Sequence, residues 1–219
     1  TKFYMWKLFG DLTDFTYCRV FIGAPKSNLT NDQRSTSYFE PGYIWRCKLS
    51  TGDPKCEILH FTDQLCEDKT SNRDDGTCDS NFMGGSLTFN NEVFVSCAPT
   101  WRRKKRNPTL GLRMDGACYW MSKATALRTE LPNVLNRNQP SQNSIRTDRG
   151  SLIPFQQLEF NNPGYLSISG IPRWYFAESG FSAHIARNRD VLIGAPGVVG
   201  WSGSLIKLDS RGSYNQWGF

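Results

Sequence analysis

The sequence predicts an all-β protein made of repeated units of short antiparallel strands. One apolar phrase occurs three times, as RVFIGAPKSN at 19–28, EVFVSCAPTW at 92–101 and DVLIGAPGVVGW at 190–201. The segments around each copy are rich in Val, Ile, Phe and Tyr and are bounded by turn residues, which is typical of strands. Glycine and proline, at 19 and 11 residues, punctuate a chain of 219 residues throughout.

The apolar core of each copy is VFI, FVS or VLI, a nearly continuous run that predicts a strand buried on both faces. Proline cannot donate to a strand ladder, so each of these strands should stop at Pro25, Pro99 or Pro196. The small residues before proline leave room where neighbouring backbones crowd together. Long loops are therefore expected to leave the same end of every unit.

Further strands are predicted on both sides of each copy. Upstream strands are predicted in NFMGGSLTF (81–89) and SGFSAHIA (179–186), whereas LFGDLTDF (8–15) fits this pattern poorly. Hairpin turns are expected at Asn90 and Asn91 and at 187–190. Alternating strands follow downstream in 41–49, 115–121 and 202–208. Because one such unit cannot bury its own faces, several are expected to pack side by side.

Charge and motifs exclude several functions. The net charge is +6, and the basic run at 102–107 is interpreted as a solvated loop tip, although 103–106 also fits a secretory convertase site. A nucleic-acid partner is not expected, because that requires a wider basic face with interleaved aromatic residues. The sequence contains no run of ~18 apolar residues, so no bilayer span is predicted in it. The sequence has no nucleophile elbow, P-loop or paired-acid motif, so an enzyme is not expected.

Cysteine spacing favours disulfides over metal binding. The seven cysteines form no CxxC pair, so a zinc site is poorly supported. The last six can be taken as sequential neighbours, Cys47 with Cys56, Cys66 with Cys78, and Cys97 with Cys118. Local pairing of this kind suits an oxidising compartment, but spacing alone leaves the connectivity open. The sequon at Asn28 is a candidate glycosylation site on a surface loop.

The repeated units resemble the FG-GAP repeats of integrin alpha subunits. The motifs that carry the resemblance are FMGGSL, VFVSCAPTW, GFSAHIARNRDVLIGAPGVVGW and RVFIGAPKSNLT, each with its downstream glycine and strand. The family's small disulfides after the first two Ala-Pro motifs fit Cys47–Cys56 and Cys97–Cys118. The resemblance covers most of the chain. It implies an N-terminal, three-blade arc of a seven-bladed β-propeller with four-stranded antiparallel blades.

The expected domain organisation follows this resemblance. The first blade is assigned to 1–64, the second to 65–135 and the third to 136–219, with insertions at 65–80 and 133–160. No D-x-D-x-D-G loop occurs, and the Asp74–Gly76 stretch is interpreted as a solvated turn. No metal or cofactor is therefore expected in this chain, and calcium is expected only in later blades beyond it. The chain is expected to be a fragment of a longer ectodomain or a truncated product.

The resemblance also implies a receptor function and its residues. Aromatic residues of the Phe-Gly motifs would cup a basic side chain of an integrin beta subunit through cation–π contacts. The matching residues are Phe82 and Phe181, with Phe9 a weaker match, and ordinary core packing is the alternative. The candidate residues for binding an extracellular-matrix protein are Arg173, Trp174, Tyr175, Glu178 and Trp201.

Ligand class and location are expected from the same resemblance. RGD-binding members place an acidic residue where this sequence has Arg173 and Trp174, so a laminin-type ligand is equally compatible. Trp201 has blade packing as its alternative role. The expected location is the extracellular side of the plasma membrane, with any membrane attachment in a region beyond this sequence. The alternative functions are a lectin-like module, a propeller that accompanies a phospholipase domain, or an orphan product.

Overall fold

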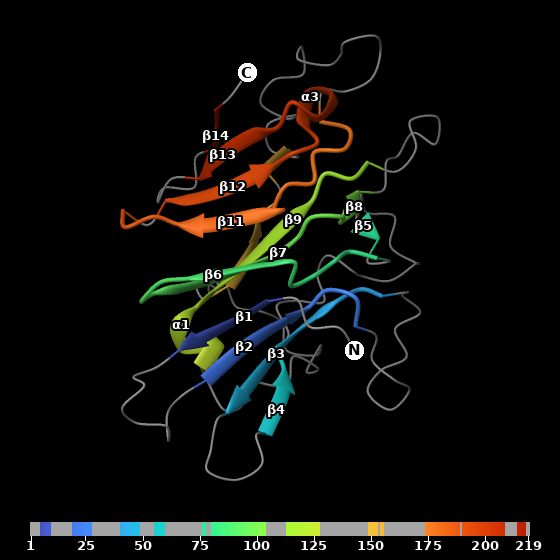
Figure 1. Cartoon of the computed structure of the whole chain (residues 1–219). Helices are drawn as coiled ribbons and strands as arrows, with labels where there is room; N and C mark the ends of the chain where they lie inside the picture. Colours follow the sequence, from blue (N-terminus) through green and yellow to red (C-terminus); the bar gives the residue numbers. More distant parts are fainter. Residues whose placement is uncertain are drawn as a thin grey trace, which may run out of the picture.

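The computed structural model is an all-β structure, as the sequence predicts. It describes residues 5–9, 19–27, 40–48, 55–59, 76–77, 80–103, 113–127, 149–152, 154–155, 174–188, 190–208 and 214–217. Within these residues lie three antiparallel sheets of four strands each and one pair of two-residue strands. Figure 1 shows the three large sheets stacked in chain order from the blue sheet to the red one.

The first sheet has the strand order β1-β2-β3-β4. Its strands are β1 (Met5–Phe9), β2 (Arg19–Ala24), β3 (Tyr43–Lys48) and β4 (Lys55–Ile58). Strand β2 contains the first VFI run and stops just before Pro25. Strand β1 overlaps the segment 8–15 only at residues 8 and 9, and this segment fits the upstream pattern poorly.

The second sheet has the order β10-β9-β7-β6. Its strands are β6 (Ser86–Phe89), β7 (Val93–Ala98), β9 (Ala117–Ser122) and β10 (Arg149–Leu152), and the short helix α1 (Lys123–Leu127) follows β9. The expected turn joins β6 to β7, where the Asn90 side chain accepts hydrogen bonds from the backbone N–H groups of Glu92 and Val93. Strand β10 lies within residues 136–219, yet it pairs with β9 of the second sheet.

The third sheet has the order β11-β12-β13-β14. Its strands are β11 (Ser182–Ile185), β12 (Val191–Ala195), β13 (Ser204–Leu208) and β14 (Tyr214–Trp217), with the one-turn segment α3 (Val198–Trp201) between β12 and β13. The paired short strands are β5 (Gly76–Thr77) and β8 (Arg102–Arg103).

The first strand of each sheet lies on the same side of the stack. Strand β6 contacts β1 of the preceding sheet and β11 of the following one. Each sheet then extends outward through its second, third and fourth strands. Sheets that share an inner side in this way are compatible with successive blades of a partial propeller.

Two apolar cores fill the spaces between consecutive sheets. Phe21 of β2 and Phe94 of β7 meet between the first and second sheets, with ring centroids 4.8 Å apart. Val95 of β7 and Ile193 of β12 belong to the core between the second and third sheets. Strand β7 is therefore buried over most of its length, as the sequence predicts, because its sheet has a neighbour on each side.

Strands β2 and β12 differ from that prediction. Burial alternates along β12, where Ile193 is fully buried and its neighbours Leu192 and Gly194 are half-buried. Only one of its two faces packs against another described sheet. The continuous apolar run thus indicates a strand, but its burial depends on whether both neighbouring sheets are present.

Two of the predicted disulfides are confirmed. Cys47–Cys56 joins β3 to β4, and Cys97–Cys118 joins β7 to β9. Both pairs are directly opposite each other across neighbouring strands. The Cys66–Cys78 pairing lies outside the described residues, as does the sequon at Asn28.

Candidate functional site

The Ala-Pro segments place a set of loops at one end of the sheets. Strands β2, β7 and β12 finish at Ala24, Ala98 and Ala195, and their registers set these residues at corresponding ends. We call this end of the molecule the loop end. The segments 80–85 and 174–181, which lead into β6 and β11, also lie there, because β6 and β11 run antiparallel to β7 and β12.

Glycines allow neighbouring sheets to approach closely at the loop end. A Cβ atom on Gly23 of β2 would lie 2.2 Å from the carbonyl oxygen of Gly84. A Cβ atom on Gly180 would lie 2.4 Å from Cβ of Cys97 in β7. Gly84 and Gly180 also have φ angles of +85° and +96°, which L side chains rarely adopt.

The same glycines bind their own sheets through the backbone. The Gly84 N–H donates to the Cys97 carbonyl at 3.1 Å, and the Gly180 N–H donates to the Gly194 carbonyl at 3.0 Å. Gly84 and Gly180 therefore occupy equivalent positions in the second and third units. Each start of an inner strand is fixed to its own sheet and nested against the preceding one.

This equivalence changes how the aromatic residues align. Ser86 pairs with Cys97 and Ser182 pairs with Gly194, so Gly85 is the structural counterpart of Phe181. Phe82 is instead the counterpart of Glu178. Both have positive φ, at 60° and 50°, and both accept a backbone hydrogen bond from the residue three positions later.

Phe82 nevertheless covers the position that corresponds to the Phe181 side chain. A Cβ atom on Gly85 would lie only 2.8 Å from Cδ1 of Phe82. The ring of Phe82 thus lies over Gly85, in the space that a side chain at position 85 would enter. Phe181 itself is 63% exposed at the start of β11. The two units place aromatic rings at the loop end from positions three residues apart.

The structure does not bring Phe9 together with these two residues. In the pairing of β1 with β2, Met5 lies opposite Gly23, and Phe9 lies opposite Arg19. Phe9 is therefore at the end of β1 that is remote from the loop end. The sequence around Phe9 resembles the motif, but Phe9 itself lies at the opposite end of its strand.

The segment 174–180 is held against the loop that precedes β9. The Met114 N–H donates to the Tyr175 carbonyl, and the Glu178 N–H donates to the Met114 carbonyl, each at 3.1 Å. Ser179 bonds the Asp115 carbonyl through both its N–H, at 3.1 Å, and its hydroxyl, at 2.6 Å. These hydrogen bonds fix the segment between the second and third sheets.

A buried ion pair supports this contact. Nε of Arg113 lies 3.2 Å from Oδ1 of Asp115, and both side chains are fully buried. Arg113 and Asp115 flank Met114, and the backbone of Met114 and Asp115 forms the hydrogen bonds to the segment 174–180. Sequence reasoning missed it, because an Arg-x-Asp spacing alone is not specific for burial.

The predicted ligand-binding residues are divided between core and surface. Trp174 is buried, at 4% exposure, and stacks on Phe155 with ring centroids 5.7 Å apart. Tyr175 is half-buried and packs edge-on against Phe176, with centroids 4.8 Å apart. Trp201 is 64% exposed at the end of α3. Arg173 lies outside the described residues.

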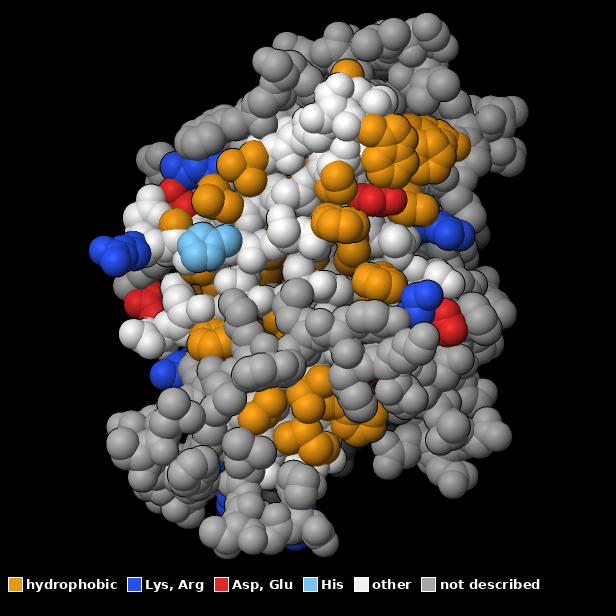
Figure 2. All heavy atoms as spheres, in the orientation of Figure 1, with side chains coloured by type: hydrophobic (Ala, Val, Ile, Leu, Met, Phe, Trp, Pro, Cys, Tyr) orange, Lys and Arg blue, Asp and Glu red, His pale blue; other side chains and the backbone are white. Residues whose placement is uncertain are grey.

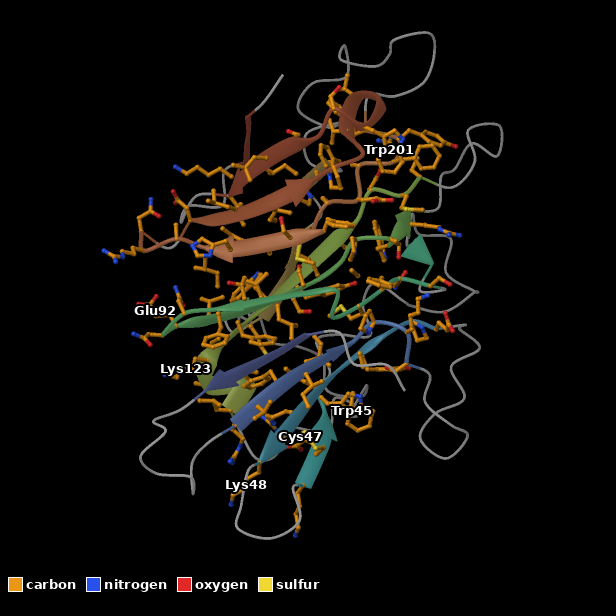
Figure 3. All side chains as sticks on the ribbon, viewed as in Figure 1. Trp45, Cys47, Lys48, Glu92, Lys123 and Trp201 are labelled. Atoms are coloured by element: carbon orange, nitrogen blue, oxygen red, sulfur yellow. A yellow bond between two sulfur atoms is a disulfide. The ribbon has the colours of Figure 1, made fainter. Side chains whose placement is uncertain are left out.

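The surface residues share one part of the loop end. A Cβ atom on Gly197, just before α3, would lie 1.6 Å from the Phe176 carbonyl oxygen, so α3 packs directly on the 174–180 segment. Figure 3 shows Trp201 pointing away from the sheets beside this segment. On the face in Figure 2, apolar side chains and a carboxylate group lie side by side in the same region.

Glu178 supplies an acidic group at this segment. Partial burial raises the pKa of the Glu178 carboxyl above its ordinary value. Phe176 is 44% exposed and lies in the same segment, although the sequence did not single it out. Its only sequence signal is its place between Tyr175 and the buried Ala177.

The part of the chain that the structure describes offers neither a metal-ligand cluster nor a membrane-spanning helix. No group of three or more His, Cys, Asp or Glu side chains there could hold a metal ion. Within the same described residues, no helix has the length and apolarity needed to cross a membrane. The expectation of no cofactor in this chain remains a prediction.

Comparison with known proteins identifies the relatives of this chain. No protein-family model matches it. It is 29% identical over 204 residues to integrin alpha-PS5 of Drosophila melanogaster, which covers 89% of the chain and 16% of that protein. It is 27% identical to integrin alpha-PS3 of the same species, over 85% of the chain and 15% of the relative.

A vertebrate relative extends this result. Human integrin alpha-8 is 23% identical over 89% of the chain, which again spans 16% of the relative. The chain is similar to integrin alpha subunits. These matches support an N-terminal integrin alpha region, in agreement with the sequence resemblance. The chain spans about one sixth of the length of these integrin alpha relatives.

Proposed function

We propose that the chain is part of a cell-adhesion receptor of the integrin alpha type, which pairs with a beta subunit and helps to bind an extracellular-matrix protein. The observation that carries this proposal is the similarity to integrin alpha subunits over 85–89% of the chain in three relatives. The side-by-side sheets with a common inner side agree with it. The proposed location is the extracellular side of the plasma membrane.

The three sheets are proposed to be the first three blades of a seven-bladed propeller. On this proposal the second blade would reach residue 152 and not end at 135, because β10 pairs with β9. The remaining blades, with their calcium loops, would belong to the rest of such a receptor. Glycosylation is proposed at Asn28, which stands shortly after β2 in the sequence.

The beta-subunit contact is proposed for the aromatic rings beside the inner strands. Phe181 exposes 63% of its surface at the start of β11, and the Phe82 ring lies over the equivalent position beside β6. A basic side chain of a beta subunit placed between such rings would gain cation–π attraction. The proposed contact does not include Phe9, because the register sets it at the opposite end of β1.

The matrix ligand is proposed to bind the segment 174–180 together with α3. Tyr175 and Trp201 supply aromatic surface, and Glu178 supplies an acidic group. Aromatic anchors with a charged neighbour are typical of protein-binding surfaces. Trp174 would act from below, since it packs on Phe155 and holds the segment rather than meeting the ligand.

The test is co-precipitation of the full receptor chain with a co-expressed integrin beta subunit of the same species. Phe181→Ala should reduce the recovered beta subunit severalfold, because an exposed ring contributes to the interface and not to the core. Leu205→Ala is the matched control, since Leu205 is also an exposed apolar residue of the third sheet, at 37%. Equal losses for the two variants would contradict the proposed contact, and no association of the unaltered chain would contradict the receptor function.

A further inference from the structure

The two described disulfides differ sharply in their access to solvent. Cys97 and Cys118 are both fully buried, and Gly180 of the third unit packs on their atoms. Cys56 is exposed on β4, the outermost strand of the first sheet, while its partner Cys47 is 4% exposed. Figure 3 shows Cys47 on β3, facing the short strand β4. The exposure of Cys56 therefore favours attack by an external thiolate on this pair without opening of the core.

Two lysines flank the exposed disulfide. Lys48 and Lys55 lie directly opposite each other in the pairing of β3 with β4, next to Cys47 and Cys56, and both are exposed. Their positive charge favours the approach of an anionic thiolate. Like charges directly opposite each other also destabilise a strand pair. The disulfide is thus the covalent link that holds this pair of strands against the repulsion of the lysines.

We propose that Cys47–Cys56 is a redox modification site, which an external dithiol, such as a thioredoxin-type oxidoreductase, reduces while Cys97–Cys118 stays oxidised. One thiolate of the dithiol attacks Sγ of Cys56, forms a mixed disulfide and expels Cys47 as a thiolate. The second thiolate of the dithiol then attacks the first sulfur of the same dithiol, which is bonded to Cys56, and expels Cys56 as a thiolate. The dithiol leaves as a disulfide, two electrons pass to the cysteine pair, and the two protons of the dithiol end on Cys47 and Cys56.

Reduction has a defined path into the second sheet. Glu57 of β4 accepts hydrogen bonds from Nε and Nη2 of Arg46, at 2.9 and 2.5 Å. Nη1 of the same buried guanidinium donates to the carbonyl of Ala126 in α1 at 2.5 Å. Release of β4 removes Glu57 from Arg46. It thereby loosens the side chain that ties the first sheet to α1.

The direct test is differential cysteine labelling on the receptor as cells display it. Dithiothreitol, as the probe dithiol, is titrated under native conditions, new thiols are alkylated, and the remaining disulfides are labelled after denaturation. Mass spectrometry should show Cys47 and Cys56 reduced at least about tenfold faster than Cys97 and Cys118, which must await opening of the core. Equal rates, or reduction of neither pair before denaturation, would overturn the proposal.

A charge reversal tests the part played by the lysines. Lys48→Glu/Lys55→Glu keeps a like-charge pair across the strands but repels the thiolate, so reduction of Cys47–Cys56 should slow about fivefold or more at low salt. The difference should shrink at high salt. Lys26→Glu/Arg187→Glu is the matched control, because it changes the net charge equally at two exposed sites away from the disulfide. An equal slowing in the control would overturn the role of the lysines.

Hydrogen exchange tests the structural consequence separately. After selective reduction, backbone amides of 55–59 and of α1 should exchange faster, while those of β12 keep their protection. Faster exchange in 55–59 alone would overturn the path through Arg46 and leave the modification site standing. Unchanged exchange in both segments would overturn the release of β4.

Discussion

Two glycines at the loop end show two separate costs of adding a side chain: the strain of a positive φ angle and steric crowding. Gly180 and Gly200 both have positive φ, at +96° and +62°. A Cβ atom on Gly180 would enter the Cys97–Cys118 disulfide, whereas one on Gly200 would meet nothing within 4 Å. The pair therefore forms a natural control for the close approach of the second and third sheets.

Gly180→Ala should destabilise the protein more than Gly200→Ala. The left-handed conformation alone costs about 1–2 kcal/mol for an L side chain. Overpacking against the disulfide should add about 1–3 kcal/mol at position 180. Denaturant unfolding of both variants measures the difference. Equal losses of unfolding free energy would mean that the sheets can separate at this point without cost.

Glu178 should make the stability depend on pH. Burial raises the pKa of its carboxyl above the ordinary value of 4.5, so the folded protein keeps a proton that the unfolded chain has released. The folded state binds more protons in this window, and stability therefore falls as pH rises from about 4.5 through the raised pKa. Glu178→Gln should flatten this decline in unfolding free energy. Parallel pH curves for the two proteins would contradict the prediction.

At the scale of elements, the entry into β6 has exchanged the positions of a glycine and an aromatic residue. Phe82 has φ of 60°, which suits glycine, while Gly85 has no such requirement. The ring of Phe82 lies where a side chain at position 85 would go. The third unit has the other arrangement, with Phe181 at the position equivalent to Gly85.

Exchanging the two residues tests this equivalence. Gly85→Phe alone should destabilise the protein, since its Cβ would lie 2.8 Å from Cδ1 of Phe82. The double variant Phe82→Gly/Gly85→Phe should recover most of the loss, because the ring is vacated and glycine takes the positive φ. A double-mutant cycle of unfolding free energies measures the coupling. Additive losses would show that the ring of Phe82 does not occupy this space.

The sequence predicted the strands better than their partners. The runs VFI, FVS and VLI lie in β2, β7 and β12, because burial and strand ends leave a local pattern. The pairing of β10 with β9 leaves no such local pattern, since the two strands are far apart in the sequence. The two cross-strand disulfides could be proposed from local spacing, while register had to come from the structure.

The candidate site was predictable only in part. Aromatic residues near a Phe-Gly pattern were found, but a shift of three residues between Phe82 and Phe181 cannot be read from composition. Phe9 lies opposite Arg19, at the end of β1 that is remote from the loop end, because a local Phe-Gly pattern does not report which end of a strand it occupies. Trp174 and Trp201 have the same residue type, yet Trp174 is buried in the core between the second and third sheets, whereas Trp201 is exposed.

At the scale of the whole molecule, Arg46 links the first sheet to the second. Arg46→Met should lower the unfolding free energy by about 1–3 kcal/mol, because the buried carbonyl of Ala126 would lose its donor. Glu57→Gln is the control and should cost no more than about 1 kcal/mol, since the Glu57 side chain is 50% exposed. Chemical denaturation of both variants measures this ratio. A larger loss for Glu57→Gln would place the link in the ion pair instead.

The segment that leads into the first strand of the second and third sheets packs on the preceding sheet, and this favours assembly of the sheets in chain order. Gly84 rests on Gly23, and Gly180 rests on Cys97, so each later segment docks on a strand that emerges earlier from the ribosome. Domains of growing chains generally fold from the N-terminal side as they are synthesised. Each finished sheet can thus act as a template for the next one during translation.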